Sequence, residues 1–570
     1  MSQPAIKLPT QPFRERRGVP DSPLQRIGHI VSVTGPSAVA VLERNGQSAS
    51  RGEFPRVQIG ALVKVATPVS SAIGLVTAIS TPMPPGDSQG EDLALVELDL
   101  VGEVLAVGAD QRLTFRRGVT SPPSIRDALL LADRHDLTRV YAPPALASIK
   151  VGTLYQDPAV AACLRVDDLL SKHFVVVGST GSGKSCALTL ILQRILDDHK
   201  HAHIVVLDIH NEYLTAFGDR VESINLNNFN LPFWLLNFQE LSAALTTGDE
   251  HRDAETEILG EAVVYAKRRY NEAAAMRSAL VRKVVDNGPI TVETPSPFRL
   301  SDVIAYLDEQ LGKLERTQLT LPYRRLKTRI ETMVADQRYN FMFGSLTVQD
   351  TMSEILSRLF RVPSDGKPIT VIDLSIVPAE ILDVVISVIS RLAFDLAIWS
   401  KGGLPTLLVC EEAHRYAPAG ERGHFGPTRQ ALARIAKEGR KYAVSLALVT
   451  QRPSELDPTI LSQCSTAIAL RLSSERDQQV MRAATHEGLI DLLDFLPLLG
   501  DREAIVLGQG VAMPMRITFD DLDAKAVPRN LNAGFSKSWK SPNLSREELD
   551  SIVARWRQAG REKAEIGFAG

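Results

Sequence analysis

The sequence predicts an α/β fold with a mainly parallel sheet, preceded by a small β-barrel and interrupted by an inserted helical subdomain. From residue 151 onward, short apolar runs alternate with helical stretches, which is the pattern of buried parallel strands joined by helices. Short β-type runs separated by Gly and Pro turns come before them. A long stretch of helical periodicity, at about residues 209–367, then separates two of the buried runs.

Length and composition are those of a folded protein with several domains. The 570 residues exceed one ordinary core, and 44% hydrophobic with 23% charged residues argues against disorder over most of the chain. The formal net charge of −3 indicates no overall affinity for nucleic acid. Any contact with DNA therefore has to come from a local patch, such as the lining of a pore.

Cysteine usage and the apolar segments predict a cytoplasmic protein. The four cysteines have no CxxC spacing, so neither a zinc site nor a disulfide framework is indicated. The segment 1–18 lacks the apolar run of a signal peptide, and no stretch of about 18 uncharged apolar residues follows. We therefore expect no membrane span, which weighs against translocases that carry their own anchoring helices.

The first part of the chain divides into three predicted segments. Residues 1–23, rich in Pro, Arg and Gln, form a flexible arm. Residues 24–118 contain the runs HIVSV, AVAVLE, ALVKVA and LALVELDL and form the β-barrel. Residues 119–150, with two Pro-Pro pairs, form a connector to the next domain.

The α/β core is predicted over residues 151–525. Its strand candidates are HFVVVG, HIVVLD, ITVIDLS, TLLVCEE, VSLALVT and TAIALRL. The helical insertion, about 209–367, lies between the second and the third of these. The remaining residues, 526–570, form a C-terminal extension that ends in a helix, because Ser545 and Glu548 make a capping-box pattern.

The strongest chemical signal is the segment GSTGSGKS, which follows the strand HFVVV and precedes the helix CALTLILQRIL. Strand, motif and helix stand in the order that a P-loop requires, which a plain Gly/Ser turn does not need. Its glycines let backbone N–H groups face phosphate oxygens, Lys184 supplies a cation to the β and γ phosphates, and Ser185 offers a hydroxyl to Mg²⁺. The residues predicted to bind ATP and Mg²⁺ are Gly178, Ser179, Thr180, Gly181, Ser182, Gly183, Lys184, Ser185 and Cys186.

Two acidic residues, Glu411 and Glu412, end the apolar strand TLLVC. A P-loop site needs one carboxylate near the magnesium ion and another to orient or deprotonate the attacking water. Strands of such a sheet converge on the ligand at their carboxyl ends, so this pair can supply both. An acidic pair at a strand end is more often a solvated turn, but the P-loop earlier in the chain favours the catalytic interpretation.

Polar and basic residues around the strand VSLALVT suggest two further roles. Gln451 ends this strand, where a polar side chain can touch the γ phosphate and report hydrolysis; simple strand termination is the alternative. The preceding run ARIAKEGRKYAV is basic, and an arginine inserted from the next subunit can stabilise the charge on a transferring phosphoryl group. We favour Arg440 as this trans arginine, with Arg434 as the alternative, against a merely solvated helix face.

The segment Asp208 to Tyr213, DIHNEY, is expected to end the strand beside the P-loop strand. Its polar side chains would then face the nucleotide edge or the subunit seam. A metal site is one interpretation of His210 with Glu212, but no partner His or Cys stands at ligand spacing, so we predict a polar network. We likewise do not assign His414 to a metal site, since the HExxH pattern is absent.

Taken together, six blocks of the sequence resemble the HerA family, whose members are similar to the FtsK translocases. They are KHFVVVGSTGSGKS, VVLDIHNEY, TVIDLS, LLVCEEAHRYAP, RIAKEGRKYAVSLALVTQRPSELDPTILSQC and ALRLSSERDQ, in the family's order. The similarity runs from about Leu24 to Phe519. It implies a RecA-like P-loop ATPase core, a barrel of the HAS type at residues 24–118, and six subunits closed into a ring around duplex DNA.

The resemblance also implies roles for single residues. These are nucleotide and Mg²⁺ binding for Lys184 and Ser185, assistance to the metal for Glu411, catalysis for the Glu412 carboxylate, sensing for Gln451 and a trans arginine for Arg440. Many relatives have Asp or another residue at the position of Glu411. The resemblance further implies that the barrel docks an effector protein and that the C-terminal segment braces a neighbouring subunit.

We therefore predict an ATP-driven homohexameric translocase or helicase that acts on duplex DNA. It would work with a partner effector, such as a nuclease or a sirtuin-like protein, in DNA end processing or antiphage defence. A pore would concentrate a few basic side chains on the phosphate backbone. Arg422 and Arg429, in the loop GERGHFGPTRQ, are candidates for its lining.

Two other functions fit the same motifs. One is a nucleotide-binding ring scaffold that assembles and regulates an effector enzyme, with DNA pumping secondary. The other is a conjugation-type or packaging ATPase that moves DNA across an envelope, which the lack of membrane helices disfavours. Stimulation of ATP turnover by DNA distinguishes the motor from the scaffold.

Overall fold

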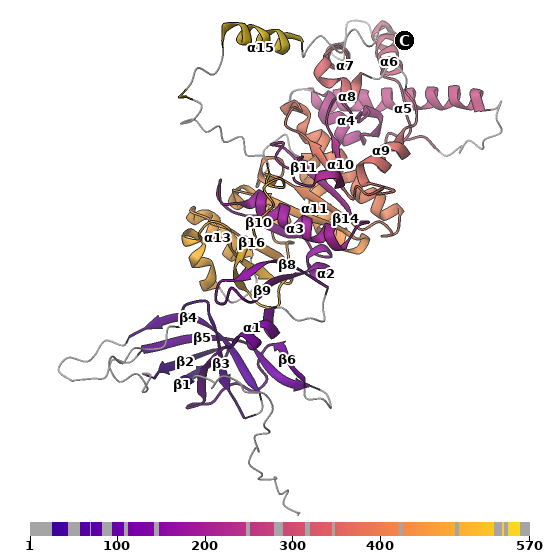
Figure 1. Cartoon of the computed structure of the whole chain (residues 1–570). Helices are drawn as coiled ribbons and strands as arrows, with labels where there is room; N and C mark the ends of the chain where they lie inside the picture. Colours follow the sequence, from indigo (N-terminus) through magenta and orange to yellow (C-terminus); the bar gives the residue numbers. More distant parts are fainter. Residues whose placement is uncertain are drawn as a thin grey trace, which may run out of the picture. The chain divides into compact units, whose positions relative to one another are not determined.

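The computed structural model of the chain contains two compact units, Met1–Val140 and Tyr141–Gly570, which are described separately (Figure 1). The residues that the structure describes are 26–43, 57–68, 70–81, 94–107, 112–141, 147–246, 251–278, 289–313, 320–344, 348–420, 426–484, 490–528, 539–540 and 545–558. The predicted arm, residues 1–23, lies outside them.

The first unit is a closed antiparallel barrel. Its strand order is β2-β1-β7-β3-β4-β5, and the first part of β5 also pairs with β2, which closes the barrel, while the last part of β5, from Gly102 to Val107, pairs with β6. The strands are β1 (Arg26–Thr34), β2 (Ser37–Leu42), β3 (Leu62–Ala66), β4 (Ser71–Ser80), β5 (Ala94–Val107), β6 (Arg112–Arg117) and β7 (Ala128–Leu131).

The barrel core follows from the alternation of side chains along each strand. In β2, for example, Ala38, Ala40 and Leu42 are buried and the residues between them are partly exposed. The predicted N-terminal barrel is thus confirmed. Strand β7 lies in the segment predicted as a connector, because the prolines before it conceal a four-residue strand.

The second unit is built on an 11-stranded sheet in the order β12-β13-β11-β14-β15-β10-β16-β17-β18-β8-β9. In this order, all strands from β12 through β10 to β16 pair in parallel. The strands β17, β18, β8 and β9 then continue the sheet with antiparallel pairings. The strands are β8 (Ser148–Leu154), β9 (Ala161–Arg165), β10 (Phe174–Val177), β11 (His203–Asp208), β12 (Val221–Ile224), β13 (Ile369–Asp373), β14 (Thr406–Cys410), β15 (Val444–Thr450), β16 (Thr466–Ala469), β17 (Glu503–Gly508) and β18 (Met515–Phe519).

All six predicted core strands are present, as β10, β11, β13, β14, β15 and β16. The helices that join or follow the strands are α1 (Arg134–Tyr141), α2 (Val166–Leu170), α3 (Lys184–Asp198), α10 (Ala379–Trp399), α11 (Gly426–Glu438), α12 (Pro458–Leu461), α13 (Glu475–Ala484) and α15 (Arg546–Gln558). The predicted fold class, a RecA-like α/β core with a barrel before it and a helical insertion, is therefore confirmed. None of the helices in the described part of the chain combines the length and the apolarity needed to cross a membrane.

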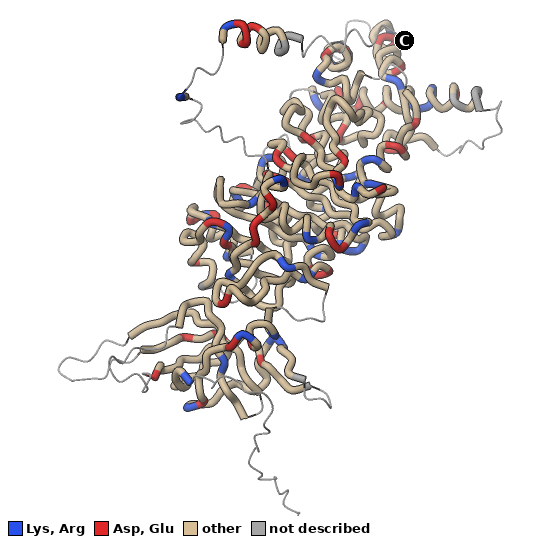
Figure 2. Tube along the Cα trace, in the orientation of Figure 1, with Lys and Arg blue, Asp and Glu red and all other residues tan. Residues whose placement is uncertain are grey.

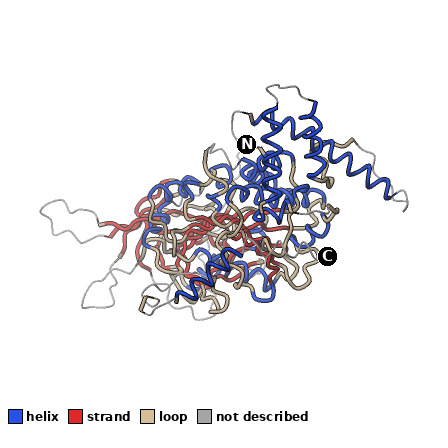
Figure 3. Tube along the Cα trace, turned by 90° about the horizontal axis from the view of Figure 1, so that it is seen from above, coloured by secondary structure: helices blue, strands red, loops and turns tan. Residues whose placement is uncertain are grey.

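The insertion contributes a further group of helices, and Figure 3, in which all helices are blue, shows a cluster of helices that projects beyond the red strands. The helices of the insertion are α4 (Phe238–Leu245), α5 (Arg252–Ser278), α6 (Leu300–Lys313), α7 (Thr320–Ala335), α8 (Asn340–Phe343) and α9 (Met352–Phe360). The same stretch also holds β12, which is the edge strand of the main sheet. Three aromatic rings form part of its core, since Phe233 contacts Phe298 at 5.1 Å and Phe343 at 6.0 Å between ring centroids.

The C-terminal helix α15 begins as its sequence predicts. The backbone N–H of Ser545 donates to Glu548 Oε2 at 2.7 Å, and the backbone N–H of Glu548 donates to Ser545 Oγ at 3.2 Å. This reciprocal pair is the capping box, which satisfies N–H groups that have no partner inside the helix.

Candidate active site

The loop between β10 and α3 has the backbone of a phosphate-binding turn. Gly181 and Gly183 adopt φ values of 77° and 95°, in the left-handed region that favours glycine. At Gly178 a Cβ atom would lie 2.4 Å from Ser182 Oγ and 3.0 Å from Leu470 Cβ, so a side chain there would displace the loop. Gly183 precedes α3 and provides no side-chain cap, which leaves the N-terminal N–H groups of α3 to a ligand.

Lys184 is buried at the start of α3, with 8% of its surface exposed. Its Nζ donates to the backbone oxygen of Ser179 at 3.2 Å, across the loop. Burial lowers the pKa of Lys184, while the nearby carboxylates of Glu412, Glu212 and Glu411 act in the opposite direction. The ammonium group is therefore surrounded by acids that would compete with phosphate for it.

The acidic residues come from the carboxyl ends of β11 and β14, which pair in parallel. Asp208 accepts hydrogen bonds from the backbone N–H groups of His210 and Glu212 at 3.2 Å and of Tyr213 at 2.9 Å. Burial, reinforced by the adjacent Asp208, raises the pKa of Glu411 well above its usual range. Glu411 thus lies in a crowded carboxylate cluster, where a cation would relieve the repulsion.

Glu412 occupies a strained position at the end of β14. Its φ of 47° is left-handed, which is uncommon for a residue with a side chain and is typical of active sites. Its Oε2 lies 3.2 Å from Nδ1 of His414, which is also 3.0 Å from Thr450 Oγ1. Burial lowers the pKa of His414, while the neighbouring Glu412 carboxylate acts in the opposite direction.

Gln451 lies against the P-loop, where it was predicted as a sensor. Strand β15 pairs with β10, with Thr450 opposite Val177, so the residue after β15 reaches the loop that follows β10. Thr180 Oγ1 donates a hydrogen bond to Gln451 Oε1. A change in the loop on hydrolysis would therefore be transmitted directly to the end of β15.

Several buried oxygen atoms at this edge lack a hydrogen-bond partner among the described residues, as a site for phosphate and Mg²⁺ requires. They are Ser182 Oγ, Tyr213 Oη, Glu411 Oε2 and Glu412 Oε2. Hard oxygen donors are the ligands that Mg²⁺ prefers, and at such sites it relies on phosphate and water for most of its shell. Accordingly, the described part of the chain has no group of three or more His, Cys, Asp or Glu side chains arranged for a metal ion. When bound, Mg²⁺ neutralises charge on the phosphates.

Comparison with known proteins agrees with this site. A family model described as the central domain of helicase HerA matches residues 149–393. The protein named DNA double-strand break repair helicase HerA from Pyrococcus furiosus is 27% identical over 410 residues, covering 66% of this chain and 71% of its own. The central part of the chain is therefore similar to the HerA family.

One relative is similar over more of the chain. The DNA double-strand break repair helicase HerA of Sulfurisphaera tokodaii is 25% identical over 548 residues, covering 92% of this chain and 99% of its own. Among solved structures, VirB4 of Thermoanaerobacter pseudethanolicus is similar over 66% of this chain and 98% of its own, with 14% identity and a TM-score of 0.46.

In this P-loop ATPase, Arg440 and the P-loop of the same chain lie at opposite edges of the parallel sheet. Arg440 stands in a short 3₁₀ turn, Gly439–Tyr442, just before β15 begins, whereas the P-loop follows the end of the parallel strand β10. Its side chain is exposed and lines a cavity of about 780 Å³ together with Lys200 and His201. Arg440 therefore faces the amino ends of the strands and can reach only a nucleotide outside its own chain.

Arg434, the alternative trans arginine, already has a partner within the chain. Its guanidinium group lies over the ring of Phe394, 4.6 Å from the centroid. This cation–π contact between α11 and α10 has a packing function. The geometry thus favours Arg440 over Arg434 for a role in a neighbouring site.

The prediction that the segment DIHNEY follows a strand beside the P-loop strand is wrong. Strand β11 pairs with β13 and β14, so β14 and β15 separate it from β10. The predicted polar network nevertheless exists, because the turn after Asp208 brings Glu212 to Ser185. Glu212 Oε2 accepts a hydrogen bond from Ser185 Oγ at 2.7 Å. Sequence reasoning missed Glu212 as a site residue, although its place after a buried strand was the available signal.

The pore candidates have different outcomes. Arg422 lies outside the described residues. Arg429, on the first turn of α11, is half-buried, and its Nη1 donates to the backbone oxygen of Gly420 at 2.6 Å. Figure 2 shows basic and acidic residues interspersed over the core, which agrees with the net charge of −3.

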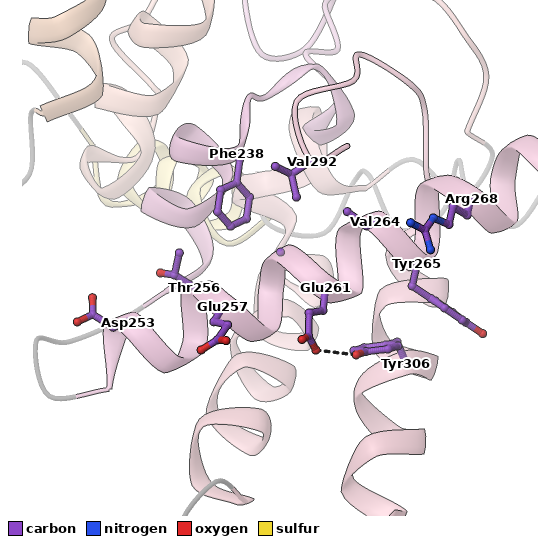
Figure 4. A pocket seen from close by; sticks show the side chains of 11 residues that line it. Phe238, Asp253, Thr256, Glu257, Glu261, Val264, Tyr265, Arg268, Val292 and Tyr306 are labelled. Carbon is purple, nitrogen blue, oxygen red and sulfur yellow. Dashed lines mark hydrogen bonds between the residues drawn. The ribbon is translucent and has the colours of Figure 1, made fainter. Parts of the chain in front are cut away.

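A separate groove of about 810 Å³ lies on the helical insertion (Figure 4). Three carboxylates of α5, Asp253, Glu257 and Glu261, lie along it, and Tyr306 donates a hydrogen bond to Glu261 Oε2 at 2.8 Å. The groove contains none of the predicted site residues. The active site is thus defined by the P-loop edge and not by this concave surface.

Proposed function

We propose that this chain is an ATP-driven motor that moves along duplex DNA as a homohexameric ring. The observation that carries the proposal is the division of the hydrolysis machinery between two edges of one sheet. Lys184, Glu412 and Gln451 lie at the carboxyl edge, while Arg440 is exposed at the amino edge. A complete site then needs two subunits, which couples hydrolysis in one to movement of the next.

The chemistry assigned to each residue follows from its position. Lys184 and the N–H groups of the P-loop bind the phosphates, and Ser185 with Glu411 holds Mg²⁺. Glu412 orients and deprotonates the attacking water, with its carboxylate held beside His414. Gln451 senses the γ phosphate through Thr180, and Arg440 of the neighbouring subunit stabilises charge on the transferring group.

The DNA substrate and the partner are inferred from the relatives. Proteins named DNA double-strand break repair helicase HerA are similar along most of the chain, which supports action on DNA. We further propose a partner effector, a nuclease or a sirtuin-like protein, in DNA end processing or antiphage defence. Contacts with phosphates would give binding that weakens with salt and depends little on sequence.

The deciding experiment is steady-state ATP hydrolysis by the full chain, with and without linear duplex DNA, for the wild type and Glu412→Gln. We expect DNA to raise turnover and the substitution to abolish hydrolysis, while binding of a fluorescent ATP analogue is retained. Turnover that ignores DNA and rises only with an added effector protein would instead identify a regulated scaffold. Light scattering of the same samples measures the number of subunits.

A further inference from the structure

The hydroxyl of Ser185 donates its hydrogen bond to Glu212, a residue outside the P-loop and outside the acidic pair. The distance from Ser185 Oγ to Glu212 Oε2 is 2.7 Å, and both side chains are half-buried. Glu212 is itself fixed, because its backbone N–H donates to Asp208 Oδ1 at 3.2 Å. It follows Asn211, whose φ of 55° turns the chain back toward α3.

This contact has a consequence for any cation at Ser185. A serine hydroxyl has one proton and two lone pairs, and it binds a metal ion through a lone pair. Its proton must therefore go to another acceptor, which then decides where the lone pairs point. An ionised carboxylate is an acceptor only, so Glu212 can take the proton and leave the lone pairs of Ser185 Oγ for a cation.

Glu411, the acid expected to accompany Ser185, has an Oε2 atom without a hydrogen-bond partner among the described residues. Of these two acids, it is Glu212 that accepts the hydrogen bond of the Ser185 hydroxyl. The orientation of the P-loop hydroxyl depends on Glu212.

We propose that Glu212 is a positioning residue for the magnesium-bound nucleotide, which orients the Ser185 hydroxyl by accepting its proton. The inference rests on the proposed ATPase function, because it assumes that a magnesium nucleotide binds at the P-loop. Its competitor is a purely structural role, in which Glu212 only ties the turn after β11 to α3. A structural tie would affect nucleotide binding with and without Mg²⁺ alike.

The test measures binding of a fluorescent ADP analogue to the full chain, in EDTA and in a Mg²⁺ titration, for Glu212→Ala, Glu212→Gln, Ser185→Ala and the double variant Ser185→Ala/Glu212→Ala. For Glu212→Ala we expect the Mg²⁺ concentration at half-saturation to rise roughly 10- to 100-fold, the usual effect of removing such an outer partner. Affinity in EDTA should change by less than about twofold, because the phosphate-binding N–H groups are intact.

Two comparisons make the test specific. Glu212→Gln keeps an acceptor oxygen of similar reach, so its shift should be smaller than that of Glu212→Ala. The double variant should be no worse than Ser185→Ala alone, because the two residues act through one interaction. Thermal unfolding of each variant checks that it folds. If Glu212→Ala does not fold, the nearly isosteric Glu212→Gln is used in its place for the Mg²⁺ titration.

The outcomes separate this inference from the function on which it rests. If wild type does not bind the analogue at all, the proposed nucleotide site is wrong. If wild type binds it equally in EDTA and in Mg²⁺, no magnesium ion at Ser185 contributes to binding and the inference is overturned. If wild type depends on Mg²⁺ but Glu212→Ala has the same half-saturation, or loses affinity equally in both conditions, Glu212 is a structural tie and the inference is overturned.

Discussion

At the scale of single residues, the site depends on how its carboxylates are held. The backbone of Glu412 has a left-handed conformation, which is unfavourable for a residue with a side chain. The Oε2 atom of Glu412 lies 3.2 Å from Nδ1 of His414. His414 is in turn fixed by Thr450 at the end of β15. The catalytic carboxylate is thus connected to the strand that carries Gln451.

Replacing His414 should therefore slow hydrolysis without weakening nucleotide binding. For His414→Ala we expect kcat to fall roughly 10- to 100-fold, because a small misplacement of a catalytic group has that effect, with KM nearly unchanged. His414→Asn, which can present an N–H donor near the same place, should retain more activity. Steady-state ATPase assays measure both constants, and an unchanged kcat in His414→Ala would show that Glu412 is held by its backbone alone.

Asp383, on α10, predicts a pH dependence of stability. It is buried, its Oδ1 has no hydrogen-bond partner among the described residues, and burial raises its pKa to about 6. Because the unfolded chain has an Asp pKa of about 3.9, the folded state binds more protons between these values. The contribution of this group to stability is therefore fully present below about pH 4 and is lost as pH rises through 6.

Asp383→Asn should remove this penalty. We expect the variant to be more stable than wild type at pH 8, by up to roughly 3 kcal/mol, and to gain much less at pH 5. Thermal or urea unfolding at the two pH values measures the difference. Equal gains at both values would mean that the Asp383 carboxyl does not titrate in this range.

At the scale of elements, the sequence predicts the strands that are buried on both faces of the sheet and misses an edge strand in which polar and apolar residues are mixed. Strands such as β10 and β14 are short continuous apolar runs, so their composition suffices. Strand β12, with the sequence VESI, is an edge strand with one fully buried residue and escaped prediction. Lys184 and Glu412 could be predicted because motif spacing defines them. For Glu212 the available signal was its place after a buried strand, but its contact with Ser185 depends on the conformation of the turn after β11, which the sequence pattern does not specify.

A buried ion pair links helix α4 of the insertion to helix α10 of the core. Glu240 of α4 accepts from Arg391 of α10, with Nη2 to Oε2 at 3.0 Å, and also from Ser387 Oγ at 2.9 Å. Arg391 Nη2 donates further to the backbone oxygen of Leu235 at 2.6 Å. Glu240 is 1% exposed, so neither water nor salt can replace its partner.

Breaking this pair on one side should loosen the insertion. Glu240→Ala removes the buried carboxylate from Arg391 and leaves Asp395, 3.2 Å from Nη1, as its remaining acidic partner, so the loss of unfolding free energy should reach at most about 3–5 kcal/mol. The matched control is the apolar pair Glu240→Leu with Arg391→Met, which should lose clearly less. Hydrogen exchange of α4 locates the effect. Losses in the paired variant as large as the sum of the single ones would show that the two residues do not depend on each other.

At the scale of the whole molecule, the parallel sheet separates the proposed site residues into two groups. Its strands place the P-loop, the acidic cluster and Gln451 at their carboxyl ends, and Arg440 before the start of β15. No movement within one sheet brings the two edges together. If Arg440 takes part in hydrolysis, a second chain must present it.

Mixing of inactive variants tests this requirement. Lys184→Ala should not bind nucleotide, and Arg440→Ala should bind it but turn over roughly 10³-fold more slowly or worse, as for loss of other arginine fingers. When the two are co-expressed in equal amounts, about one quarter of head-to-tail interfaces combine an intact Lys184 with an intact Arg440. ATPase activity should then reappear, although no chain carries both residues.

Two controls show which arginine acts and from where. Lys184→Ala mixed with Glu412→Gln should stay inactive, because both residues serve the site of their own chain and every site lacks one of them. If Arg434→Ala replaces Arg440→Ala and activity is lost and then recovered by mixing, Arg434 is the trans arginine instead. Absence of recovery with Arg440→Ala, in rings shown by light scattering to contain both variants, would contradict a site shared between subunits.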